Sequence, residues 1–181
     1  KTGKVETEVN AGYVFNAGLV SPHFLPPGER TVMVENPYIV LANDTIATQT
    51  DLKKIADGFN QHSFMKSEGR WLIIVCSDMA GVALASSIAR QHADQHGNPT
   101  GRMLPLLVIG VPKDINSKMF FEEMSAATGA KVISREAGAP IHNFDWLRDV
   151  GTAASVVSSL GTTSVQYLDH NKPGRVTVSK L

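Results

Sequence analysis

The sequence predicts an α/β domain in which partly parallel β-sheets are flanked by helices. Three nearly uninterrupted apolar runs, at residues 37–42, 71–76 and 104–109, have the length and composition of strands that are buried on both faces. Segments with helical spacing separate these runs. Strands that alternate with helices are typical of a parallel sheet covered by helices.

The first forty residues predict a flexible start, an irregular loop and two strands. Residues 1–11 are polar, and we expect them to form a flexible segment ahead of Gly12. Residues 18–28 contain three prolines and two glycines, so an irregular conformation is expected there. Strands are expected at residues 31–34 and 37–42, followed by a turn at Asn43-Asp44.

Two helices are predicted on either side of the second apolar run. The second helix follows a turn at residues 77–81 and extends to about residue 96. Its interior, residues 82–89, is small and apolar almost all round, so the helix either lies deep or presents a second apolar face. The first helix begins near residue 51, with Thr50 or Asp51 as its cap, and its apolar stripe is Leu52, Ile55, Ala56 and Phe59.

The second half of the chain predicts a third helix and a β-rich tail. The helix covers residues 115–128 and ends at Gly129, since glycine readily takes the left-handed conformation of a helix end. A short strand is expected at residues 131–134 and an apolar turn or short helix at residues 144–147. The tail should add antiparallel strands, at residues 153–158, 163–168 and 176–178.

Composition argues against several classes of protein. The 181 residues carry 17 basic and 17 acidic side chains, and this zero net charge argues against a nucleic-acid binder that relies on bulk charge. No apolar stretch reaches the roughly 18–20 residues of a membrane span. The single cysteine, Cys76, excludes an intramolecular disulfide and is expected to be a buried thiol. We expect one soluble domain from a reducing, cytoplasmic compartment.

Signals for catalysis, nucleotide binding and metal binding are weak. The turn at residues 77–81 lies where a doubly wound sheet holds a ligand, but it lacks the glycine-rich phosphate fingerprint, and Ser77 or Asp78 can simply cap the helix. His92 and His96 have metal-ligand spacing without the glutamate of a zinc protease, so no metal is expected. A small α/β metabolite-binding or enzymatic domain that uses this turn stays as the alternative.

Four separated segments form an ordered series along the chain. Residues 17–24 read A-G-L-V-S-P-H-F and residues 36–42 read N-P-Y-I-V-L-A. They resemble the R-G-Y-L-S-P-Y-F and S-P-F-I-L-L-A segments of group I chaperonins, the GroEL family. Residues 72–85 and 128–134 resemble that family's L-L-I-I-A-E-D-V-E-G-E-A-L-A and T-G-G-T-V-I-S, in the same order and with similar spacing.

The part that these segments resemble is the apical domain, the polypeptide-binding third of the chaperonin subunit. The resemblance implies a β/β/α-layered domain over residues 12–181, cut from a longer subunit near a hinge at Gly12. It also implies an apolar groove, between two helices and an extended segment, that binds non-native polypeptides and a competing cochaperonin loop. The binding of ATP and Mg, and the hydrolysis of ATP, belong to the family's equatorial domain. This chain is therefore expected to be non-enzymatic and monomeric, although the full-length family forms homo-oligomeric rings.

Carried over position by position, the groove draws on the extended segment and both helices. Its predicted contacts are Leu19, His23, Phe24, Lys53, Ala56, Leu84, Ile88, Ala89 and Arg90. Lys53 stands where the family has leucine, and Ala56 is smaller than the leucine it replaces. Because each lost buried CH₂ costs about 0.8 kcal/mol, we expect a groove that relies on Phe24, Leu84 and Ile88, with an altered client preference. The family's G-F-G-D-R-R loop is also missing after Pro112.

Overall fold

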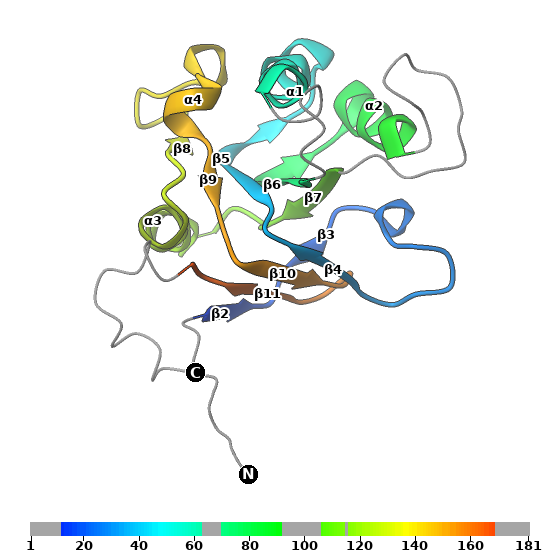
Figure 1. The fold of residues 1–181 in the computed structure, drawn as a ribbon. Helices are drawn as coiled ribbons and strands as arrows, with labels where there is room; N and C mark the ends of the chain where they lie inside the picture. Colours follow the sequence, from blue (N-terminus) through cyan, green and yellow to red (C-terminus); the bar gives the residue numbers. More distant parts are fainter. Residues whose placement is uncertain (1–11, 63–69, 92–105, 115, 169–181) are drawn as a thin grey trace.

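The computed structural model describes residues 12–62, 70–91, 106–114 and 116–168. Two β-sheets and their flanking helices make up this part of the chain (Figure 1). The smaller sheet is antiparallel, with the order β2 (Gly12–Phe15), β11 (Thr163–Gln166), β10 (Ser155–Ser158) and β4 (Val32–Glu35).

The larger sheet is mixed, and its centre is parallel. Strand β5 pairs in parallel with β6 and β8, and β6 pairs in parallel with β7, whereas β3 and β9 join antiparallel. This mixture confirms the predicted α/β class with partly parallel sheets. The order is β3 (Gly18–Leu19), β7 (Leu106–Gly110), β6 (Leu72–Met79), β5 (Tyr38–Ile46) and β8 (Val132–Ile133), with β9 (Gly151–Thr152) also on β5.

The helices cover this sheet according to the direction of its crossovers. Strands β5, β6 and β7 follow one another in one direction, so right-handed crossovers place α1 (Gln49–His62) and α2 (Gly81–Gln91) on the same face. The next crossover returns past β5 to β8, which places α3 (Ser117–Thr128) on the opposite face (Figure 1). Short helical segments complete the chain: η1 (Pro22–Phe24), η3 (Ile141–Asn143) and α4 (Trp146–Asp149).

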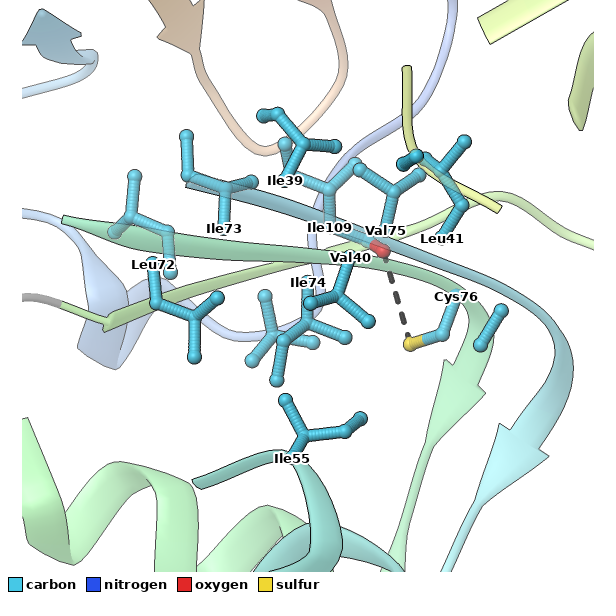
Figure 2. Packing of buried hydrophobic residues seen from close by; sticks show 14 of the residues in the cluster. Ile39, Val40, Leu41, Ile55, Leu72, Ile73, Ile74, Val75, Cys76 and Ile109 are labelled. Carbon is cyan, nitrogen blue, oxygen red and sulfur yellow. Dashed lines mark hydrogen bonds between the residues drawn. The ribbon is translucent and has the colours of Figure 1, made fainter. Parts of the chain in front are cut away.

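The core is centred on β5, β6 and β7, whose apolar runs are almost fully buried (Figure 2). Cys76 lies within β6, and its Sγ is 3.8 Å from the carbonyl oxygen of Ile109. Burial raises the pKa of the Cys76 thiol to about 12, so it is protonated and unreactive at neutral pH. The expectation of a buried thiol is confirmed.

Several local predictions hold and others are corrected. Helix α3 ends at Gly129, whose φ of +82° is left-handed as expected, and the tail strands β10 and β11 are antiparallel. The turn predicted at Asn43-Asp44 is wrong, because both residues lie inside β5, at an irregularity of its pairing with β6. Strand β2 was not predicted from the sequence.

The helix starts also differ from the prediction. Thr48 caps α1, since its Oγ1 accepts a hydrogen bond from the backbone N–H of Asp51. Strand β6 continues to Met79, so Ser77 and Asp78 are strand residues and do not cap α2. The segment 1–11, the strand at 176–178, His92 and His96 lie outside the described residues. None of the helices within the described ranges is long and apolar enough to cross a membrane.

Candidate functional site

Helix α2 carries apolar side chains on its solvent side as well as on its core side. Ala83 and Ser87 are fully buried toward the sheet. Val82 is 56% exposed, Ala89 is also exposed, and no charged residue occurs from Gly81 to Ala89. Leu84 and Ile88 are half-buried and pack against the core cluster. The second apolar face expected from the sequence is therefore present.

One side of α2 faces α1 across a hollow of about 490 Å³, which we call the α1–α2 cleft. Lys53 and Asp57 lie in its α1 wall and form an ion pair, with Lys53 Nζ 2.8 Å from Asp57 Oδ2. Leu52, the only apolar residue in the described part of the lining, is buried. The groove between the two helices thus contains polar and charged side chains beside the apolar contact that was expected. The described lining residues are Gln49, Thr50, Leu52, Lys53, Asp57 and Ser86.

The other side of α2 carries its half-buried aliphatic side chains. Leu84 and Ile88 are each two residues from Ser86, which places them about 160° from it around the helix axis. Because Ser86 lines the α1–α2 cleft, Leu84 and Ile88 face away from that cleft. We call these two residues the outer flank of α2. The segment η1 also contacts α2.

The segment η1 is a single turn that directs Phe24 inward. Ser21 caps it, since its Oγ accepts a hydrogen bond 3.2 Å long from the backbone N–H of His23. Phe24 has 0% exposed surface, and η1 contacts β7 as well as α2. The prediction that Phe24 forms an exposed groove wall is wrong, because the turn makes it a core residue. His23 is exposed beside it.

The structure separates the remaining predicted contacts into exposed and buried positions. Lys53 and Ala89 are exposed. Leu19, in β3 opposite Ile109, is 5% exposed, and Ala56 is also 5% exposed, so neither offers appreciable surface. Arg90 belongs to α2, but its side chain lies outside the described residues. Helix α1 also positions Gln49 and Asp57, which the sequence analysis missed although their four-residue spacing from Lys53 indicates a shared row.

The proposed hinge residue Gly12 is the first residue of β2 and is buried. A Cβ at this position would lie 2.8 Å from Gln166 Nε2 and 2.9 Å from the carbonyl oxygen of Val165. The neighbouring strand β11 therefore approaches so closely that no side chain fits at this position, which explains the glycine.

A second hollow, of about 580 Å³, lies beside the carboxyl ends of β6 and β7. Thr45, Ser77, Asp78 and Lys113 are among its lining residues. Ser77 is 7% exposed, and its hydroxyl donates to Asn43 Oδ1 over 3.3 Å. This is the place where the alternative of a metabolite site was expected. The described ranges contain no group of three or more His, Cys, Asp or Glu that could hold a metal ion.

Comparison with known proteins identifies the fold. No family model matches the sequence. Among solved structures, the chain is similar to chaperonin gp146 from the bacteriophage EL 2 (Pseudomonas aeruginosa), in two crystal forms obtained in the presence of ATP-BeFx. In form II the TM-score is 0.59, the identity is 11%, and the match covers 90% of this chain. In form I the TM-score is 0.58 at 11% identity, over 96% of this chain. The chain spans 30% of the length of that chaperonin and has the fold of a chaperonin domain.

Proposed function

We propose that this chain is the apical, polypeptide-binding domain of a chaperonin of the GroEL family, and that it holds non-native polypeptides on α2 and the adjoining α1 and η1. The likeness to one part of a phage chaperonin supports a chaperonin domain. The observation that carries the binding role is the solvent side of α2. Its exposed Val82 and Ala89 and its half-buried Leu84 and Ile88 offer apolar contact without charge.

An apolar helix face suits a partner of variable sequence. Hydrophobic burial is non-directional and depends on area, so it tolerates many different client chains. Exposed apolar surface on a folded domain often marks such an interaction site. The expected contacts are therefore Val82, Leu84, Ile88 and Ala89, with His23 at the border, and Phe24 supports the surface from inside.

Suppression of aggregation tests this proposal. An unfolded client protein is diluted from denaturant, and light scattering is recorded with and without the 181-residue chain. We expect the chain to reduce scattering and the Val82→Glu and Ala89→Glu variants to lose this effect. Both residues are exposed, so a new charge there leaves the core intact.

Leu147→Glu provides the matched control, because Leu147 is 76% exposed on α4, at a distance from α2 (Figure 1). This variant should protect the client as well as the wild type does. The proposal fails if the wild type leaves aggregation unchanged, or if both α2 variants protect as well as the control.

The wider properties of the family are part of the same proposal. ATP and Mg bind elsewhere in a longer polypeptide, the assembled protein forms a homo-oligomeric ring in the cytoplasm, and this chain alone is monomeric and without catalytic activity. A cochaperonin loop competes with clients for the surface on α2. Size-exclusion chromatography with light scattering checks the monomer, and competition by a loop peptide checks the shared surface.

A small-molecule-binding domain is the second candidate, and the hollow lined by Ser77 and Asp78 is the observation that favours it. This candidate predicts saturable binding of a small polar ligand that Ser77→Ala and Asp78→Asn abolish while protection of unfolded clients is absent from the wild type. Client protection that depends on Val82 and Ala89 excludes it as the main function.

A further inference from the structure

The α1–α2 cleft adds a pair of charged side chains, Lys53 and Asp57, to the proposed binding surface. On α1, Gln49, Lys53 and Asp57 are spaced four residues apart and form one row along the helix. Thr50 and Ser86 add hydroxyl groups to the lining. Because Leu52 is buried, the exposed side chains in the α1 wall of the cleft are the polar ones.

The charges in this row are available to a bound chain. The side chains of Lys53 and Asp57 are 68% and 55% exposed, although their charged atoms are 2.8 Å apart. An exposed pair of this kind adds little to stability, because water solvates and salt screens both charges. Lys53 and Asp57 can therefore separate and each pair with an opposite charge on a client, without lowering the stability of the fold.

A purely apolar segment matches this cleft poorly. It would displace water from both charged groups without offering either of them a hydrogen bond, and such desolvation is unfavourable. A segment that carries both an acidic and a basic side chain can pair with Lys53 and Asp57 at once. Charge complementarity thus favours the segment with both charges over the purely apolar one.

Resting on the proposed function, we propose that the α1–α2 cleft binds stretches of non-native polypeptide in which acidic and basic side chains lie close together, and that it discriminates against purely apolar stretches. Val82, Ala89 and the outer flank of α2 bind apolar stretches of the same clients. Salt screens exposed charges, so the contribution of the cleft falls as ionic strength rises. Apolar contact on α2 does not weaken in this way.

Two soluble probe peptides of equal length and equal apolar content test the inference. One carries Glu and Lys at four-residue spacing, and the other carries Gln at the same positions. Their affinities for the 181-residue chain are measured by fluorescence anisotropy. The measurement is made at about 0.01 M and about 1 M salt, between which the screening length falls from about 30 Å to about 3 Å.

A matched pair of double variants separates the cleft from general charge. Lys53→Met with Asp57→Asn removes the charges of the cleft. Lys54→Met with Asp51→Asn removes the same charges from α1 at positions that do not line the cleft. At low salt, the wild type and the second variant should bind the charged peptide about two- to fivefold more tightly than the Gln peptide, the range of an exposed ion pair. The cleft variant should bind both peptides equally.

The possible results distinguish this inference from the proposed function. Equal affinity of the wild type for both peptides, or a retained preference in a cleft variant with unchanged thermal unfolding, overturns the inference and leaves the proposed function standing. If the wild type binds neither peptide and does not protect an unfolded client, the proposed function fails and the inference fails with it.

Discussion

The α1–α2 cleft and the outer flank of α2 differ in chemistry, although both adjoin one helix of eleven residues. Toward α1, Ser86 shares the cleft with the charged side chains of Lys53 and Asp57. On the outer flank, Leu84 and Ile88 are half-buried against the core cluster. The same backbone scaffold therefore carries one surface with charged groups and one that is aliphatic.

This difference separates what the fold determines from what single side chains determine. The crossovers of the parallel sheet place α1 beside α2 whatever the exposed side chains are. The polarity of the cleft depends on a few positions, such as Lys53, whose side chains touch little else. Binding specificity can thus change while the fold persists, so substitutions in the core should alter stability and substitutions in the cleft should alter binding.

The largest effect is expected from Phe24→Ala, which tests whether η1 belongs to the core or to the binding surface. Phe24 is fully buried, so its truncation should lower the free energy of unfolding by about 3–5 kcal/mol. Urea denaturation measures this change. His23→Ala, at the exposed neighbour, should stay within about 0.5 kcal/mol of the wild type. Similar stability of the two variants would mean that Phe24 is a surface residue and that η1 does not contribute to the core.

Substitution of Asp149 should lower the free energy of unfolding by a smaller amount. Asp149 is the last residue of α4, which packs against α1. Burial disfavours the Asp149 carboxylate, but hydrogen bonds from the Arg148 side chain and the Asp145 backbone N–H, together with the charges of Arg148 and Lys131, outweigh it and lower its pKa. A Cβ on Gly58 of α1 would lie 2.8 Å from Trp146 Cβ, so α4 limits the position of α1.

The lowered pKa of Asp149 determines the sign of the pH effect. The folded protein keeps the carboxylate ionised at a lower pH than the unfolded chain does. The stabilisation by Asp149 is therefore fully present above the pKa of the unfolded chain, about 3.9, and is lost as the pH falls through the lower pKa of the folded protein. Asp149→Asn should remove this acid sensitivity and cost about 1–3 kcal/mol at pH 7. Thermal unfolding between about pH 3 and pH 7 checks it. A variant that loses stability in acid as the wild type does would contradict the assignment.

Much of the fold could be predicted from the sequence, because buried strands and amphipathic helices leave strong local patterns. The runs at β5, β6 and β7 and the stripe of α1 follow from periodicity alone. Strand β2 could not be predicted from the sequence, because its four residues gain their conformation from pairing with β11, which lies about 150 residues away in the sequence. The turn expected at Asn43-Asp44 failed for the same reason, since pairing with β6 overrides local turn preference.

The candidate surface was predictable only in part. The uncharged composition of α2 indicated a second apolar face, and the structure has one. Composition could not indicate that Phe24 turns inward, because a one-turn helix capped by Ser21 sets its direction. The polar cleft requires Gln49, Asp57 and Ser86 to meet across two helices, and this contact depends on the tertiary packing.

On the outer flank itself, Ile88→Ala should lower the free energy of unfolding by an intermediate amount. Ile88 is half-buried, so the loss should be about 1–2 kcal/mol, below the roughly 2–5 kcal/mol of a fully buried aliphatic side chain. Urea denaturation measures it, and Ala89→Ser, at an exposed neighbour, serves as the control. A cost near zero would mean that Ile88 does not pack on the core and that the outer flank is entirely surface.

The smallest effect on stability is expected from Lys53→Met, in the opposite wall of the α1–α2 cleft. The Lys53–Asp57 pair is exposed, and methionine keeps most of the aliphatic length, so the free energy of unfolding should change by less than about 0.5 kcal/mol. Removing the ammonium group should nevertheless raise protection of a strongly apolar client, because one less charge is desolvated on binding. Urea denaturation and light scattering, run on the same preparation, check the two results. If Lys53→Met costs as much stability as Ile88→Ala, the α1 wall of the cleft and the outer flank of α2 contribute equally to stability, and side-chain chemistry alone does not distinguish them.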